Sequence, residues 1–216
     1  MLVSMTTGIT LTAISLLLAI LTSGNGAADP IDQNIALLRK GNTSERREAA
    51  ELLSRLGDQR AIKPLAEALH DADQLVRHTS EGALWRIWHR SGRPDVDARL
   101  QEGIHAMERG ALDQAIDFFT EVIEMAPDFA EGYNKRATTY YLMQEFNKSI
   151  KDCESTLRLN PVHFGALSGT GLNYLGLHNF IKALEYFERA VAVNPNMPQI
   201  QEYIKAIQKY LRDQSL

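Results

Sequence analysis

The histidines and the single cysteine are the side chains of this chain that could most readily carry out acid–base, nucleophilic or metal chemistry. No two histidines stand four residues apart, no His-Glu dipeptide occurs, and no carboxylate is spaced to match. The chain also has no glycine-rich phosphate loop and no Gly-x-Ser-x-Gly sequence. We therefore predict a non-catalytic protein without a cofactor or a metal. The histidines are His70, His78, His89, His105, His163 and His178.

Cys153 is the only cysteine among the 216 residues, so the fold cannot depend on an internal disulfide. No basic residue that would favour a thiolate is evident beside it. We expect a buried, unreactive thiol that packs as a small apolar group.

The distribution of charge excludes one class of partner. The chain has 23 basic and 27 acidic side chains, a formal net charge of −4. Residues 29–93 hold 11 basic and 10 acidic groups, and residues 94–216 hold 12 and 17. Neither half has the basic excess that neutralising phosphates requires, so we expect no nucleic-acid partner.

The elements that must position any functional residue repeat between residues 96 and 198. Pro127, Pro161 and Pro195 lie 34 residues apart, and small and large residues recur in the same order around each. Each copy has a small residue at one fixed position of the repeat, which we call the small column. Later in the copy come two residues four positions apart, and the first of these two is also small. The small column is Gly103, Ala137 and Gly171, and the pairs are Ala115–Phe119, Ser149–Cys153 and Ala183–Phe187.

The period, the small-residue column and the closing proline resemble the tetratricopeptide repeat (TPR), in which each unit is a pair of antiparallel helices. The resemblance implies an all-α, right-handed solenoid whose residues 94–198 form three units, at 96–129, 130–163 and 164–197. A polar helix in residues 199–216 would cap the array. Arg99 and Glu102 replace bulky apolar residues of the first copy, which suggests that this face meets something other than a repeat neighbour.

Residues 29–93 predict a second, shorter helical array. Apolar residues recur at helical spacing in 31–38, 45–56, 61–69 and 71–87. The run from Leu56-Gly57-Asp58 to Val76-Arg77 resembles HEAT-like repeats of the phycobilisome-lyase type. That resemblance implies a ladder in which Asp71 or Asp73 pairs with Arg77. The short link at 91–94 predicts a near-continuous solenoid that bends at Gly92-Arg93-Pro94.

Trp85 and Trp88 stand three residues apart just before this link. The HEAT-like unit cannot bury both indoles alone, because neighbouring apolar residues already supply its core face. We favour a role in covering the junction with the first TPR helix, Leu100 to Met107. The alternative is an exposed aromatic anchor for a partner.

The concave surface of the TPR array is the predicted binding site. In TPR proteins the first helix of each pair lines this surface. Relatives that hold chaperone C-termini place a clamp of lysine, arginine and asparagine there. The corresponding positions are Leu100, Ile104, Lys135, Gly165 and Gly169, so the clamp is absent. A mostly apolar groove suits an extended or helical peptide with hydrophobic anchors. The predicted groove residues are Leu100, Ile104, Met107, Asn134, Lys135, Thr138, Tyr141, Leu142, Ser168, Leu172 and Asn173.

Residues 1–28 have the pattern of a secretory signal peptide. No charged side chain occurs before Asp29, an apolar run extends from Ile9 to Leu21, and Gly26-Ala27-Ala28 fits a cleavage site. The start of the segment lacks lysine and arginine, and residues 2–22 could just span a bilayer, so an uncleaved anchor is the alternative. We expect a periplasmic or secreted protein, or one anchored by residues 2–22 that faces the periplasm.

Together these features predict a non-catalytic adaptor that binds a protein or peptide in the TPR groove within an exported compartment. The alternative is an accessory enzyme subunit, or a lyase-like protein that binds a small prosthetic group. Lyase activity does not follow from the HEAT-like resemblance, because the resemblance covers structural residues only.

Overall fold

Polar caps determine where the helices of the N-terminal half begin. Asp29 accepts a hydrogen bond from the Ile31 N–H at the start of α1. Asn42 and Glu45 form a capping box at the start of α2. The elements of this half are α1 (Pro30–Lys40), α2 (Thr43–Leu56), the 3-10 turn η1 (Gln59–Ala61), α3 (Ile62–Ala68) and α4 (Gln74–Trp88).

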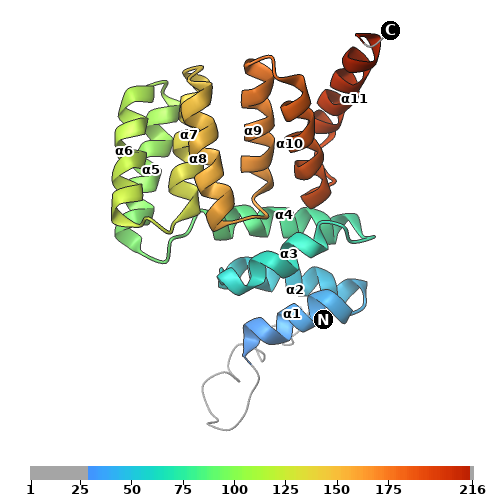
Figure 1. The fold of residues 1–216 in the computed structure, drawn as a ribbon. Helices are drawn as coiled ribbons and strands as arrows, with labels where there is room; N and C mark the ends of the chain where they lie inside the picture. Colours follow the sequence, from blue (N-terminus) through green and yellow to red (C-terminus); the bar gives the residue numbers. More distant parts are fainter. Residues whose placement is uncertain (1–28, 215–216) are drawn as a thin grey trace, which may run out of the picture.

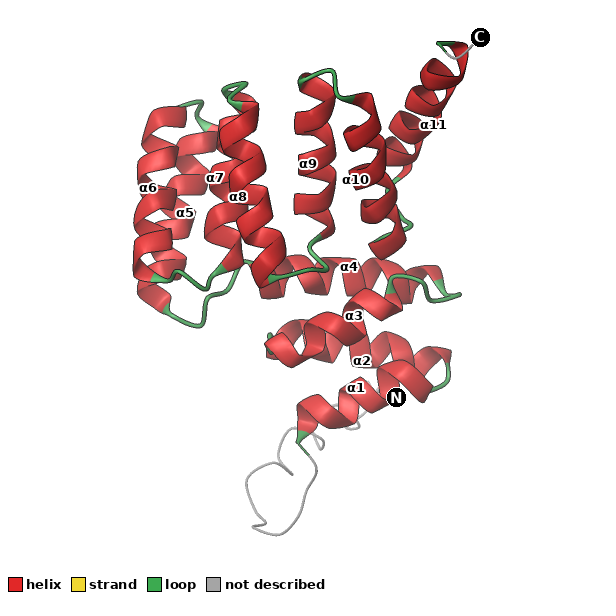
Figure 2. Cartoon of the chain, in the orientation of Figure 1, coloured by secondary structure: helices red, strands yellow, loops and turns green. Residues whose placement is uncertain are grey.

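The computed structural model describes residues 29–214, which form an all-α repeat solenoid as predicted (Figures 1 and 2). The predicted signal or anchor segment, residues 1–28, lies outside the described residues. Within residues 29–214, none of the helices has the length and apolar character needed to cross a membrane.

The C-terminal half consists of three helix pairs and a final helix. Each predicted 34-residue unit contains one pair, and α11 follows the third. The elements are α5 (Pro94–Glu108), α6 (Leu112–Met125), α7 (Ala130–Leu142), α8 (Phe146–Leu159), α9 (Phe164–Gly176), α10 (Phe180–Val193) and α11 (Pro198–Asp213).

Small residues let the two helices of a unit approach closely. A Cβ on Gly103 would lie 2.4 Å from the Phe119 ring, and one on Gly171 would lie 2.5 Å from the Phe187 ring. The second unit has Ala137 in the same column, buried within α7. The small column is therefore the place where a bulky residue of the second helix packs against the first, as the repeat pattern predicted.

The two arrays are joined differently from the predicted near-continuous solenoid. Figure 1 shows α4 lying across the ends of the TPR helices, with α1 to α3 stacked beyond it. The loop between α10 and α11 packs on the HEAT-like segment: the Asn196 amide donates to the Leu69 carbonyl (3.0 Å) and accepts from Arg77 Nε (2.9 Å). In the same loop, the Asn194 side-chain amide donates to Glu81 of α4 (3.2 Å). The HEAT-like helices therefore support the inter-repeat loops instead of extending the solenoid.

The two aspartates of the predicted ladder pair with arginines other than the predicted Arg77. Arg46 makes a two-pronged ion pair with Asp71 (2.7 and 2.9 Å), and Arg47 pairs in the same way with Asp73. Arg77 instead donates to the Asp71 backbone carbonyl and to Asn196. The pairing thus links α2 to the loop before α4, and Arg77 is directed to the contact between the two arrays.

Candidate functional site

A cavity of about 300 Å³ opens on the first helices of the second and third TPR units. Seven of the eleven predicted groove residues line it, all of them on α7 and α9. They are Asn134, Thr138, Tyr141, Leu142, Ser168, Leu172 and Asn173. The structure thus brings the predicted residues of these two units together around one hollow.

Asn173 is a fully buried residue of this lining with a fixed orientation. Its Nδ2 donates to the Ser149 hydroxyl (2.8 Å) and to the Gly169 carbonyl (2.8 Å). The Ser149 hydroxyl donates onward to the Ala137 carbonyl (2.8 Å), so it can only accept from Asn173. Both amide hydrogens are therefore engaged, and the Oδ1 atom is left buried without a hydrogen-bond partner. Such an unpaired acceptor is costly and uncommon in folded proteins.

Gly169 and Cys153 give the cavity its depth. A Cβ on Gly169 would lie an ordinary 3.7 Å from Cys153 Sγ, so the missing side chain leaves open space. Cys153 is buried, which confirms the sequence prediction, and burial raises the pKa of its thiol to about 11. The cysteine therefore serves as an apolar wall, and no thiolate is available there near neutral pH.

The rim of the cavity is apolar and reachable from solvent. Leu142 keeps 51% of its surface exposed, and Tyr141 lies beside Phe146 with ring centroids 6.0 Å apart. The Thr138 hydroxyl is engaged with the Asn134 carbonyl (2.9 Å). The site thus combines an apolar rim with a hollow between two helices, and such a surface suits an apolar side chain of a peptide.

The residues predicted from the first unit do not join this cavity. Leu100 is completely buried in the core of its own unit with Val96 and Phe119, so the prediction that it lines a groove is wrong. Ile104 and Met107 pack against that same core. The equivalent residues Asn134 and Ser168 are also buried, but they line the cavity, whereas Leu100 packs into the apolar core of the first unit.

Lys135 lies outside the cavity and is bound to a buried carboxylate. Its Nζ is 3.3 Å from Glu131, whose side chain has no exposed surface. The same carboxylate accepts hydrogen bonds from His163 Nε2 (3.1 Å) and the Asn134 amide (3.2 Å). His163 Nδ1 accepts from the Ala166 N–H, which fixes Nε2 as the protonated ring nitrogen. The predicted role of Lys135 in holding a ligand is therefore secondary to this internal ion pair.

Burial raises the pKa of Glu131, but its partners outweigh that effect. The hydrogen bond from His163 and the positive charge of Lys135 hold the pKa of Glu131 below its usual value. His89 approaches the other carboxylate oxygen at 3.5 Å from the end of α4. The carboxylate therefore links the HEAT-like segment to the second TPR unit.

The two tryptophans pack on the third TPR unit, which corrects the predicted contact with the first TPR helix. Trp88 is 5% exposed and stacks on His163, with ring centroids 4.1 Å apart. Trp85 meets Phe164 edge to face, and its ring occupies the space that a side chain on Gly165 would need. An exposed-anchor role does not fit Trp88. The indoles reach this far because α4 runs beneath the ends of the TPR helices (Figure 1).

Sequence reasoning missed Ser149, Cys153 and Glu131 as determinants of these sites. Ser149 and Cys153 occupy the columns that hold alanine and phenylalanine in the other two units, and we interpreted them only as weak matches to the pattern. The smaller size of Cys153 compared with phenylalanine is a usable signal, because it predicts a hollow in the second unit. Among residues 29–214, no cluster of three or more His, Cys, Asp or Glu side chains could hold a metal ion.

Comparisons with known proteins agree with the two kinds of repeat. A family model described as HEAT repeats matches residues 12–85 and 31–117. A TPR repeat-containing protein of Rhizobium etli is 33% identical over 57% of this chain, which spans 61% of that protein. Tetratricopeptide repeat protein 12 of Mus musculus is 26% identical over 55% of this chain, which spans only 17% of the mouse protein.

Solved structures show the same fold in the TPR half. The first TPR domain of Spaghetti (RPAP3), bound to an HSP90 peptide, matches 54% of this chain with a TM-score of 0.53 and 23% identity, and the match covers 93% of that domain. The Sgt2 TPR domain of Aspergillus fumigatus matches 57% of this chain with a TM-score of 0.54 and 22% identity, and the match covers 83% of it. With the geometry above, these matches support a repeat fold of the TPR and HEAT-like type for the described residues.

Proposed function

We propose that this protein is a non-catalytic adaptor that holds an extended segment of a partner protein in the cavity of the second and third TPR units. The solvent-open cavity of about 300 Å³ between α7 and α9 carries this proposal. Its exposed rim at Leu142 would receive an apolar side chain of the bound segment.

Two similar structures support a peptide as the ligand. The RPAP3 domain holds an HSP90 peptide, and the TPR2B domain of yeast Sti1, with a TM-score of 0.51, is in complex with an Hsp70 segment. This chain departs from a carboxylate clamp at Leu100, which is buried, and at Gly165, which is covered by Trp85. We therefore propose a partner segment chosen by apolar side chains and not by a terminal carboxylate.

A peptide-display selection on the purified protein tests this function, followed by affinity measurement for the selected sequences. Leu142→Glu places a charge on the apolar rim and should weaken binding by about tenfold or more, because burying an unpaired carboxylate is costly. Leu75→Glu is the matched control, since Leu75 on α4 is exposed to nearly the same extent (49% against 51%). Equal loss in the two variants, or no selected peptide at all, would overturn the proposal.

We also propose that the protein works in an exported compartment, on the pattern of residues 1–28 alone. Expression of the full chain followed by osmotic shock tests this. A soluble product whose intact mass matches a chain that starts at Asp29 would support export with cleavage. A product that retains Met1 in the membrane fraction would support the anchor instead.

A further inference from the structure

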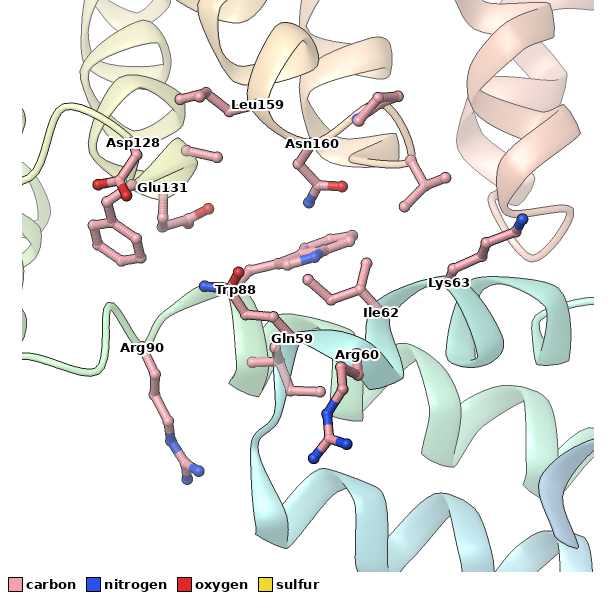
Figure 3. Close-up of a pocket in the computed structure, with 15 residues that line it drawn as sticks. Gln59, Arg60, Ile62, Lys63, Trp88, Arg90, Asp128, Glu131, Leu159 and Asn160 are labelled. Carbon is pink, nitrogen blue, oxygen red and sulfur yellow. The ribbon is translucent and has the colours of Figure 1, made fainter. Parts of the chain in front are cut away.

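A second, larger pocket of about 560 Å³ lies where the HEAT-like segment meets the loops between TPR units (Figure 3). One wall comes from η1, α3 and the end of α4. The other comes from residues 128–131 and 159–162. Its volume is within the range of small-molecule sites. The apolar part of its lining is Ile62, Ile87, Phe129, Leu159 and Val162.

Trp88 supplies a hydrogen-bond donor without an acceptor in this pocket. The residue is 5% exposed, and its indole stacks on His163 at an interplanar angle of 19°. The indole Nε1 is buried and has no hydrogen-bond partner. An indole N–H can only donate, and no acceptor among the described residues forms a hydrogen bond with it.

Asn160 supplies a second polar group that has no hydrogen-bond partner among the described residues. It is 8% exposed, and Figure 3 shows its side chain extending from the loop after α8 toward Trp88. The side-chain amide makes no hydrogen bond within residues 29–214. Its equivalent one repeat later is Asn194, whose amide donates to Glu81 and accepts from the Asn196 N–H. The same asparagine is thus satisfied by the HEAT-like segment in one unit and left open over the pocket in the other.

The charged residues around the pocket favour an anionic ligand. Lys63 and Arg90 line it, and neither forms an ion pair within the described residues. Arg60 is held by Asp29 (2.8 Å) and Asp58 (2.9 Å). In Figure 3 the side chains of both Arg60 and Arg90 point away from Trp88, which leaves Lys63 as the cation for a ligand in the pocket. Of the acidic lining, Glu131 is already neutralised by its own partners, which leaves Asp128 at one edge.

We propose that this junction pocket binds the carboxylate of an apolar acid, with the Trp88 indole and the Asn160 amide as hydrogen-bond donors and Lys63 as the cation. The apolar wall would hold the body of the ligand. Such a carboxylate could belong to a free small-molecule acid or to the C-terminus of a peptide chain. This site is separate from the groove of α7 and α9 and does not depend on a peptide binding there.

Titration of the full chain with 4-phenylbutyrate and with a short N-acetylated peptide that ends in phenylalanine tests the proposal. Each probe is paired with its neutral amide. Calorimetry gives the affinity, and the emission of the two tryptophans reports on the pocket. Each acid that binds should do so at least about tenfold more tightly than its amide, the loss expected when one hydrogen bond to a charged group is removed. Binding of 4-phenylbutyrate would show that the bound carboxylate can belong to a free acid. Binding of the peptide alone would show that it belongs to the C-terminus of a chain.

Variants distinguish binding of the acid in the junction pocket from nonspecific binding elsewhere on the protein. Lys63→Gln and Asn160→Leu should each weaken the acid by about tenfold, whereas Lys151→Gln, an exposed lysine on α8, should not. Lys63 is exposed, so its substitution leaves the fold intact even if Asn160→Leu does not. Leu142→Glu should leave acid binding unchanged, which distinguishes this site from the peptide groove. Equal affinity for acid and amide, unchanged affinity in Lys63→Gln, or no binding of either acid would overturn the proposal.

Discussion

Gly171 and Phe187 face each other across the third TPR unit so closely that a Cβ on the glycine would lie 2.5 Å from the ring. Gly169, two residues earlier on the same helix, has only an ordinary 3.7 Å contact with Cys153. Two glycines within one turn of α9 therefore have opposite roles. The first permits close helix packing, and the second leaves space in the cavity.

Alanine substitution should separate these roles. Gly171→Ala overpacks the unit against a buried ring and should lower the free energy of unfolding by about 1–3 kcal/mol. Gly169→Ala should leave stability unchanged or raise it by up to about 1 kcal/mol, because alanine favours a helix more than glycine does. Urea denaturation of both variants measures the difference. Phe187→Leu should partly restore Gly171→Ala, and a lack of coupling in this double mutant would contradict the packing argument.

A second periodic feature concerns the turns between the helices of each unit. Gly110, Gln144 and His178 lie 34 residues apart and have φ of 76°, 60° and 58°, in the left-handed region. Only the first unit has a glycine there. Gln144→Gly should therefore raise the free energy of unfolding by about 0.5–1 kcal/mol, and Gly110→Ala should lower it by a similar amount.

Thermal and urea denaturation of these two variants check the turn prediction. The Gly82→Ala variant, in the middle of α4, is a useful control because its φ is ordinary and only Arg86 lies nearby, at 3.4 Å. It should be stabilised, the reverse of Gly110→Ala. The same sign for Gly82→Ala and Gly110→Ala would show that backbone conformation does not determine the effect.

Repeat periodicity was sufficient to predict the helix pairs and the second-unit part of the cavity. Asn134, Thr138 and Tyr141 share one face of α7, as their spacing predicts, and the resemblance to TPR proteins identified that face as part of the concave surface. Repeat periodicity could not predict the contact between the HEAT-like segment and the TPR units. Trp88 meets His163, and nothing local in either segment specifies the angle at which α4 crosses the TPR helices. Leu100 was misplaced because its position in the repeat predicts the helix face on which it lies and not whether that face is covered, here by the core that includes Val96 and Phe119.

The buried carboxylate of Glu131 predicts how the junction responds to acid. His163 Nε2, the Asn134 amide and Lys135 all stabilise its charged form, and they hold its folded-state pKa below the ordinary value of 4.5. A depressed folded-state pKa contributes stability that is present above the unfolded-state value and is lost as pH falls through the folded-state value. The chain should therefore lose stability below about pH 4.5, with Glu131 as one source of that loss.

Replacing Glu131 by glutamine isolates this contribution. Near neutral pH the variant should be less stable by about 1.5–3 kcal/mol, because it loses hydrogen bonds to a charged group and leaves Lys135 without its partner. The deficit should shrink as pH falls below about 4.5, where the Glu131 carboxylate of the unfolded chain begins to take up a proton while that of the folded chain is still charged. Urea denaturation of both proteins over this range measures it. Glu154→Gln, an exposed acid on α8, is the matched control and should follow the wild type at every pH. A deficit for Glu131→Gln that does not change with pH would show that its effect comes from packing and not from the charge at the junction.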